Sequence, residues 1–345
     1  MSVTESKPTV TGVKPTLPKV VVVGTGGTIH SIGKNTLDIV RYGANDTKYV
    51  ASELVAAVEE TSWVAEPIPV DWKSVGSPFI DPAAWVELVQ VIEQAVTEHQ
   101  PAGVVVTHGT ASLEETAYFL DLALSVEVPV VVVGSQRPIS GISTDGRINL
   151  VNGIRVAADP AARGMGVMVL LNDEIHAARD VTKTSTMRMQ TFRSRDFGVL
   201  GQADADRISF YRKPVRVTAP NTEFQVAADT VLPRVDIVYS YAGADGVAIE
   251  ALVAAGAKGI VAAGFAPGGT TAAQKEALSK AFEAGVITMI STRAGSGRVI
   301  DSEWSRPTGS IPADNLTPQK ARVLLMLALT VTSDPSEIRR IFATY

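Results

Sequence analysis

The stretch Val20–Ile29, VVVVGTGGTI, sets the architecture around which the rest of the chain is arranged. Four β-branched residues run directly into a glycine-rich bend, a pattern typical of a strand that a parallel sheet buries on both faces. Gly24, Gly26 and Gly27 allow a sharp turn there because they carry no side chain. We expect Thr28 to stand at the carboxyl end of a central strand, the edge at which open α/β sheets bind their ligands.

The composition indicates a globular protein with a large core. The chain has 345 residues, 46% of them hydrophobic, and a formal net charge of −5. This size predicts two domains, and the charge gives no electrostatic footprint for nucleic acid. The sequence has no cysteine, which excludes disulfides, thiolate nucleophiles and zinc–thiolate sites. Its four histidines argue against a multi-histidine metal site, and we expect no metal.

The N-terminal stretch 1–18 is polar and contains three prolines, which predicts a flexible tail. It lacks the apolar core of a secretory signal, and no apolar run in the sequence is long enough to span a bilayer. We therefore expect a soluble cytoplasmic protein with no membrane partner. Export of a processed precursor is the alternative, since such a chain can begin after cleavage.

Strand-like and helical runs alternate along the first 210 residues. The clearest strand-like runs are Val20–Val23, Gly103–Thr107, Val128–Val133 and Gly166–Leu171. Asp81 followed by Pro82 predicts the start of one helix, and Ser112 with Glu115 predicts a capping box at the start of another. This alternation predicts a mostly parallel sheet flanked by helices.

The segment 207–228 interrupts this alternation, because it is mixed polar and holds Pro214 and Pro220. A smaller α/β unit follows it. Its expected strands are 235–241, 259–263 and 286–290, and its expected helices are 247–254, 272–284 and two that begin at Thr317–Pro318 and Asp334–Pro335. We divide the chain into a tail (1–18), an N-terminal α/β catalytic domain (19–210), a linker (211–232) and a C-terminal α/β domain (233–345).

Four stretches carry groups suited to chemistry: GTGGTI (24–29), VVVTHGTASLEET (104–116), VGSQRP (133–138) and RDVTKTST (179–186). Each lies at or soon after the end of a strand, so we expect them to line one sheet edge. Thr28, Thr110 and Lys183 then form a nucleophile set without histidine or cysteine. A threonine hydroxyl needs a neighbour to take its proton, and a lysine does so only when desolvation lowers its pKa. Backbone N–H groups of Thr110 and Ala111 are expected to stabilise an oxyanion.

Each of these residues also has a plain structural interpretation. Thr28 and Thr110 occur more often as helix caps, and an isolated lysine such as Lys183 is usually a solvated charge. His108 is expected to be a hydrogen-bonded structural residue. A glycine turn after a strand is often only a connection, and Ile29 stands where the dinucleotide-binding pattern requires glycine. Taken singly, none of these residues carries a functional assignment.

Taken together, the motifs resemble the bacterial L-asparaginase/glutaminase family of threonine amidohydrolases. The matching segments are TGGTI, THGT followed by LEETA, DVTKT, and LTPQKARVLLMLALT ahead of a helix that begins with Asp-Pro. The resemblance covers residues 20–345. It implies that Thr28 is the acylated nucleophile and that Tyr42, in LDIVRYG, assists it from a mobile loop. It assigns the second threonine and the lysine of the catalytic set to Thr110 and Lys183.

The resemblance also implies how the substrate is held. Ser77, in VGSPF, matches the serine that binds the substrate α-carboxylate. The remaining expected substrate-binding positions are Gly27, Gly76, Pro78, Gly109 and Ala111. Family members are usually homotetramers built from dimers, in which the C-terminal domain of a neighbour closes the site, and they use no cofactor.

The sequence departs from the family pattern where the substrate α-ammonium would lie. Ala111 replaces an aspartate, Pro78 replaces a residue that is often polar, and Gly243 replaces an asparagine of the neighbouring subunit. Glu303 is the nearest counterpart of the neighbour's glutamate, in a segment that aligns poorly. The pocket that grips a positive charge in the family is therefore expected to be apolar here.

This change decides the expected substrate. Removing the carboxylate partner of a desolvated ammonium costs about 3–5 kcal/mol, and each 1.4 kcal/mol is about tenfold in affinity. Asparagine is therefore expected to lose roughly a hundredfold or more through Ala111 alone. We predict an amidohydrolase for a small carboxamide without an α-amino group, such as a substituted malonamide or a succinamic-type amide. Lys183 also loses its usual carboxylate, for which Asp173, Asp180 and Glu114 are the alternatives.

Three other functions are weighed against this one. The first is an ordinary L-asparaginase/glutaminase whose ammonium site is rebuilt from other residues. The second is a catalytically silent effector-binding protein, against which the retained hydroxyl and lysine residues argue. The third is a nucleotide-binding oxidoreductase, against which the missing glycine spacing argues.

Overall fold

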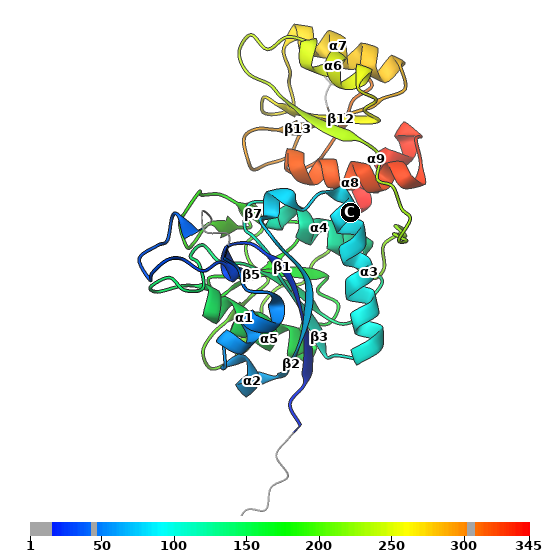
Figure 1. Ribbon diagram of the computed structural model, residues 1–345. Helices are drawn as coiled ribbons and strands as arrows, with labels where there is room; N and C mark the ends of the chain where they lie inside the picture. The colour runs from blue at the N-terminus through cyan, green and yellow to red at the C-terminus, as the bar shows by residue number, and fades with distance from the viewer. Residues whose placement is uncertain (1–15, 43–46, 302–307) are drawn as a thin grey trace, which may run out of the picture.

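The computed structural model describes residues 16–42, 47–301 and 308–345, and these form two α/β domains, one above the other in Figure 1. Within these residues, the N-terminal domain holds an eight-stranded sheet in the order β10-β9-β6-β5-β4-β3-β1-β2. The C-terminal domain holds a four-stranded sheet in the order β11-β12-β13-β14. The predicted pair of α/β domains, the first one larger, is confirmed. Most of the expected tail lies outside the described residues.

The large sheet is parallel over five of its strands and antiparallel over three. The parallel strands are β1 (Lys19–Gly26), β2 (Glu66–Val75), β3 (Gly103–Thr107), β4 (Val130–Val133) and β5 (Val167–Leu171). The antiparallel strands are β6 (Glu174–Ala177), β9 (Gly201–Ala203) and β10 (Ile208–Phe210). β1 is paired on both sides but lies next to the edge, so its position is less central than expected. The edge strand β2 was not predicted; it carries Pro67 and Pro69, which edge strands tolerate.

Helices cover both faces of the large sheet. On one face lie α3 (Pro82–His99) and α4 (Leu113–Ala123), and on the other lie α1 (Ala51–Ala57), α2 (Thr61–Val64) and α5 (Gly146–Ala158). Alternate valines of β1 separate the two cores, since Val21 and Val23 pack on the first face and Val20 and Val22 on the second. The predicted start of α3 is confirmed, because the Asp81 carboxylate accepts a hydrogen bond from the Ala84 N–H at 2.8 Å.

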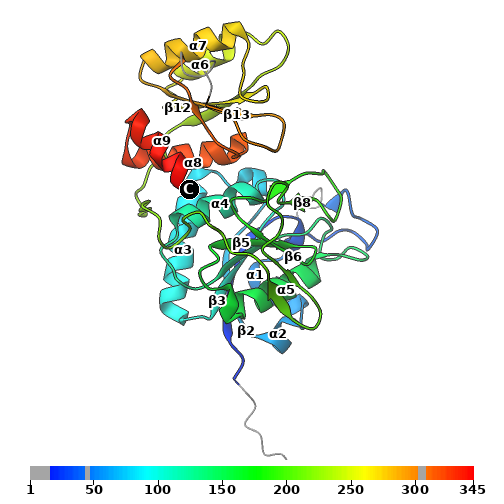
Figure 2. The ribbon, with the colours of Figure 1, turned by 180° about the vertical axis from the view of Figure 1, so that it is seen from behind.

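The C-terminal domain places its parallel sheet between two helix pairs. Its strands are β11 (Val235–Tyr239), β12 (Gly259–Gly264), β13 (Ile287–Thr292) and β14 (Ile311–Pro312). Its helices are α6 (Val247–Ala254), α7 (Ala272–Glu283), α8 (Pro318–Val331) and α9 (Pro335–Thr344). The helices α6 and α7 lie on the far side of this sheet, and α8 lies toward the N-terminal domain, where it packs against α4 (Figures 1 and 2). No helix among the described residues has the length and apolar character needed to cross a membrane.

Candidate active site

Three loops at the carboxyl ends of β1, β2 and β3 meet at one edge of the large sheet. Gly27 has a φ of +83°, and a β-carbon placed on it would lie 2.2 Å from Cα of Gly109. A β-carbon on Gly109 would in turn lie 2.9 Å from Oγ of Ser77. The two glycines therefore let the three backbones touch, which brings Thr28, Ser77 and Thr110 together.

The hydroxyl of Thr28 hydrogen-bonds the phenol of Tyr42, with an Oγ1–OH distance of 2.9 Å. Thr28 begins a short 3-10 helix, η1 (Thr28–His30), whose N-terminal cap is Gly27. No side chain caps this turn, so the helix-cap interpretation of Thr28 is wrong. Both Thr28 and Tyr42 are half-buried, which leaves the hydroxyl pair accessible to a small substrate.

A second hydroxyl, that of Thr110, pairs with a lysine. The Lys183 ammonium donates to Thr110 Oγ1 at 2.7 Å. Lys183 lies on β7 (Thr182–Lys183), which pairs with β8 (Phe192–Arg193) in a small hairpin. Burial lowers the pKa of Lys183, while the nearby carboxylate of Glu114 raises it. A lysine desolvated in this way is suited to take a proton through Thr110.

Glu114 is the carboxylate that faces Lys183. Its Oε1 accepts the Lys183 backbone N–H at 3.3 Å, and its buried Oε2 has no hydrogen-bond partner among the described residues. The two alternatives are engaged elsewhere. The Asp173 carboxylate accepts a hydrogen bond from Asn152 at 2.9 Å, and that of Asp180 lies 3.7 Å from the Arg179 guanidinium. The carboxylate near Lys183 therefore comes from the first turn of α4.

Ser77, in the short helix η3 (Ser77–Phe79), lies against the start of α4. Its Oγ accepts the Ala111 N–H at 3.2 Å, and its carbonyl accepts the Ser112 hydroxyl at 2.8 Å. The predicted capping box is therefore wrong, because Ser112 makes no cap hydrogen bond and bonds the neighbouring loop. The Ala111 N–H, expected as an oxyanion donor, is already engaged by Ser77.

Comparisons with known proteins agree with this arrangement. Residues 19–216 match the family model described as Asparaginase, N-terminal, and residues 234–342 match the Glutaminase/Asparaginase C-terminal domain. The chain belongs to the asparaginase family.

Relatives of this asparaginase-family chain are similar over almost its whole length. It is 40% identical to "L-asparaginase 2" of Bacillus subtilis (strain 168), over 96% of this chain and 88% of that protein. It is 35% identical to "Glutaminase-asparaginase" of Pseudomonas fluorescens biotype A, over 96% and 92%. The crystal structure of a "Probable Cytoplasmic L-asparaginase" from Campylobacter jejuni superposes with a TM-score of 0.90 at 38% identity, covering 95% of this chain and all of that one.

The positions that depart from the asparaginase-family pattern lie on open surface in the single chain. Ala111 and Pro78 are exposed, and Gly76 is half-buried beside them in the chain. Gly243 lies in the turn after β11 of the C-terminal domain, is exposed, and has no atom within 4 Å of a β-carbon placed on it. Glu303 lies outside the described residues. The structure of one chain thus brings the hydroxyl, lysine and serine residues together and leaves Ala111 and Pro78 exposed.

Two buried histidines lie among the loops of this asparaginase-family site, and His30 is the one that joins distant segments. His30, whose role the sequence interpretation missed, joins Thr107 through Nε2 at 2.7 Å and the Tyr49 carbonyl through Nδ1 at 2.8 Å. His108 has its Nδ1 2.8 Å from the Gly109 carbonyl oxygen, as its structural interpretation predicted. Burial lowers the pKa of each histidine to about 4, so both are neutral near pH 7. A histidine directly after the glycine-rich turn was the one available sequence signal for His30.

The VGSQRP stretch is structural. The backbone N–H groups of Gln136 and Arg137 donate to the Asp145 carboxylate at 2.8 and 3.0 Å. Gly134 packs against Thr110, since a β-carbon on Gly134 would lie 3.1 Å from Cγ2 of Thr110. Among the described residues, no group of three His, Asp or Glu side chains is placed to hold a metal ion.

Proposed function

We propose that this member of the asparaginase family hydrolyses a small carboxamide without an α-amino group, such as a substituted malonamide or a succinamic-type amide. The observation that carries this proposal is Ala111. It lies one residue after Thr110, its N–H bonds Ser77, and it presents a methyl group where the family pattern has a carboxylate. Pro78 extends this apolar surface. An amide without an ammonium group loses no binding free energy at this surface, whereas the ammonium of an amino acid lacks a carboxylate partner there.

The first half of the reaction uses the Thr28–Tyr42 pair. Thr28 Oγ1 attacks the amide carbon while Tyr42, 2.9 Å away, serves as its proton partner. The carbonyl oxygen becomes an oxyanion, which the backbone N–H of Thr110 stabilises. The C–N bond then breaks, ammonia leaves with a proton, and the acyl group remains as an ester on Thr28.

The second half uses the Thr110–Lys183 pair. The Thr110 hydroxyl and the Lys183 amine are hydrogen-bonded at 2.7 Å. A water molecule attacks the ester carbon and gives its proton to Lys183 through the Thr110 hydroxyl. The ester bond breaks and Thr28 recovers its proton, which releases the carboxylic acid. Ser77 holds the non-reacting end of the substrate throughout. The lowered pKa of Lys183 supports its role as the base in this step.

The competing function is that of an ordinary asparaginase or glutaminase. It is favoured by relatives named L-asparaginase or glutaminase-asparaginase at 35–40% identity. It requires a carboxylate to reach the ammonium position from somewhere other than residue 111. Among the described residues, Glu114 is the one acidic side chain that hydrogen-bonds a site residue, and it is buried behind Lys183.

Assembly and location complete the proposal. A homotetramer built as a dimer of dimers would cover the open side of the site, where Ala111 and Pro78 are exposed in the single chain. Gly243 would then approach from the neighbouring subunit. A cytoplasmic location is proposed as well; the names of similar proteins include both "cytoplasmic" and "periplasmic".

An ammonia-release panel tests the proposed function. It compares asparagine, glutamine, succinamate and 2-substituted malonamides, with Thr28→Ala as the blank. The proposal expects kcat/KM for a malonamide or succinamate to exceed that for asparagine. Faster release from asparagine would establish the ordinary asparaginase, and no release from any amide would establish a silent binding protein.

A further inference from the structure

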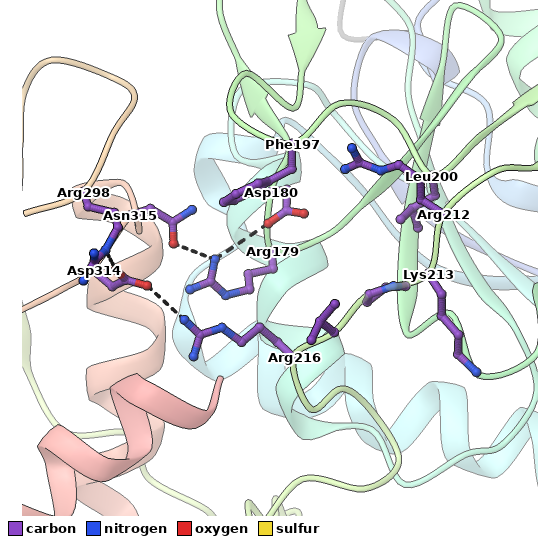
Figure 3. A pocket seen from close by; sticks show the side chains of 12 residues that line it. Arg179, Asp180, Phe197, Leu200, Arg212, Lys213, Arg216, Arg298, Asp314 and Asn315 are labelled. Atoms are coloured by element: carbon purple, nitrogen blue, oxygen red, sulfur yellow. Dashed lines mark hydrogen bonds and ion pairs between the residues drawn. The ribbon is translucent and has the colours of Figure 1, made fainter.

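A cavity of about 650 Å³ lies between the two domains, and we call it the interdomain cavity (Figure 3). No residue assigned to the amidase site lines it. One wall comes from the end of the N-terminal domain and from the segment 212–216, and the opposite wall comes from Arg298, Asp314 and Asn315 of the C-terminal domain. Its volume is typical of pockets that bind small molecules.

The lining of the interdomain cavity is strongly cationic. Its cationic side chains are Arg179, Arg212, Lys213, Arg216 and Arg298. Two carboxylates, those of Asp180 and Asp314, oppose these five charges, which leaves an excess of three positive charges. Asp314 is shared, since its oxygens lie 2.6 Å from Nε of Arg298 and 2.9 Å from Nη2 of Arg216. Nη1 of Arg216 also donates to the Ala343 carbonyl, whereas Asp314 is the one hydrogen-bond partner of Arg298 among the described residues.

Arg179 is the one buried cation among the residues that line the interdomain cavity. Its side chain is only 8% exposed, and Nη1 donates to Asn315 Oδ1 across the domain boundary at 2.9 Å. Its Nε and Nη2 atoms are buried and have no hydrogen-bond partner among the described residues. These two atoms therefore lie behind the cavity surface, and Arg179 contributes to the site through its buried positive charge, which water screens little. Figure 3 shows this side chain beside Asp180 and Asn315, at the centre of the lining.

Apart from Asn315, the remaining lining is apolar and includes Phe197, Leu200 and Pro214. A bare inorganic anion would leave this surface without a contact, whereas an anion on a carbon skeleton would cover it. Guanidinium groups bind both carboxylates and phosphates through paired N–H donors. We propose that the interdomain cavity binds a small organic polyanion, either a di- or tricarboxylate or a phosphomonoester.

Such a ligand would act on the segment that carries the catalytic lysine. Arg179 lies four residues before Lys183, and its carbonyl accepts the buried Lys320 ammonium of α8 at 2.9 Å. A polyanion bridging Arg179 and Arg298 contacts both domains at once. Ligand binding is therefore expected to stabilise the full chain against unfolding, by an amount that grows with the logarithm of the ligand concentration above the Kd.

Isothermal titration calorimetry on the full chain, at constant ionic strength set with sodium chloride, tests this proposal. The probes are citrate, glycerol 3-phosphate and acetate. We expect saturable binding of citrate, glycerol 3-phosphate or both at one site per chain, and none for acetate. Citrate alone identifies a polycarboxylate site, and glycerol phosphate alone identifies a phosphomonoester site.

Variants distinguish the cavity from general surface charge. Arg298→Gln changes a side chain that is 77% exposed, so it is expected to fold normally and to weaken binding roughly five- to tenfold. The matched control is Arg207→Gln, an exposed arginine that does not line the cavity, which is expected to bind unchanged. Absence of saturable binding by both polyanions, or equal weakening in the two variants, would overturn the proposal. Neither outcome depends on which amide the enzyme hydrolyses.

Discussion

Restoring the missing carboxylate, with Ala111→Asp, is the most direct test of the substrate assignment. The backbone N–H of Ala111 lies 3.2 Å from Oγ of Ser77, the residue proposed to hold the non-reacting end of the substrate. A carboxylate at position 111 would therefore lie beside a bound amino acid and pair with its ammonium. We expect the variant to gain activity on asparagine relative to a malonamide.

The structure sets the size of this gain. A fully buried ammonium–carboxylate pair is worth about 3–5 kcal/mol when one partner is removed. Residue 111 is exposed in the single chain, so the value for a charged hydrogen bond, about 1.5–3 kcal/mol, is the better guide. At 1.4 kcal/mol per tenfold change, the ratio of kcat/KM for asparagine over malonamide should rise roughly 10- to 150-fold.

The assay is ammonia release from both substrates, and the ratio is the readout. Residue 111 directly follows Thr110, whose hydroxyl accepts a hydrogen bond from the Lys183 ammonium at 2.7 Å. The new carboxylate would therefore also raise the pKa of Lys183. That effect slows both substrates together and cancels in the ratio. The matched control is Ala111→Asn, which has the same shape without the charge. An unchanged ratio in Ala111→Asp, or an equal rise in Ala111→Asn, would refute the reasoning.

Three further predictions concern residues that hold the site or the fold. Glu114→Gln removes the charge that raises the pKa of Lys183, so the rise of kcat with pH, which reports the neutral lysine, should move to lower pH. Gly27→Ala places a β-carbon 2.2 Å from Cα of Gly109, and ammonia release should fall about a hundredfold or more because the two loops separate. Asp81→Ala removes the cap of α3 and should lower the free energy of unfolding in urea by about 1 kcal/mol with kcat unchanged.

Each of these predictions has a matched comparison. An unmoved pH profile in Glu114→Gln would show that another group sets the lysine pKa. Gly256→Ala has a similar positive φ of +87° with nothing near its β-carbon, so it should cost stability and leave catalysis intact. Equal loss of activity in the two glycine variants would mean that backbone strain alone, and not loop contact, explains Gly27→Ala. Asp81→Asn keeps the cap, and its stability should match the parent chain.

Local patterns in the sequence were sufficient for the scaffold. The run of four valines predicts a strand that is buried on both faces, and β1 is such a strand. The Asp-Pro pair at 81–82 supplies both the N-cap and the first residue of α3. Each of these signals involves residues that are close together in the sequence. The family motifs placed Thr28 and Thr110 on loops at one sheet edge, because the loops that follow parallel strands lie on the same side of a sheet. Lys183 reaches Thr110 from β7, which follows the antiparallel strand β6, so strand direction does not account for its position. The edge strand β2 was missed because its prolines and half-polar pattern look like a loop.

Only the tertiary structure decided how distant segments use their hydrogen bonds. Ser112 and Glu115 have the spacing of a capping box, yet the Ser112 hydroxyl donates to the Ser77 carbonyl. The loop after β2 places that carbonyl within reach of Ser112, and no local pattern around Ser112 indicates this. The sequence left three carboxylates as possible partners of Lys183, and Glu114 is the one that lies beside it because β7 packs against the start of α4. The contact of Arg179 with Asn315 spans 136 residues and two domains. Such pairings depend on packing between elements, which no local pattern of residues encodes.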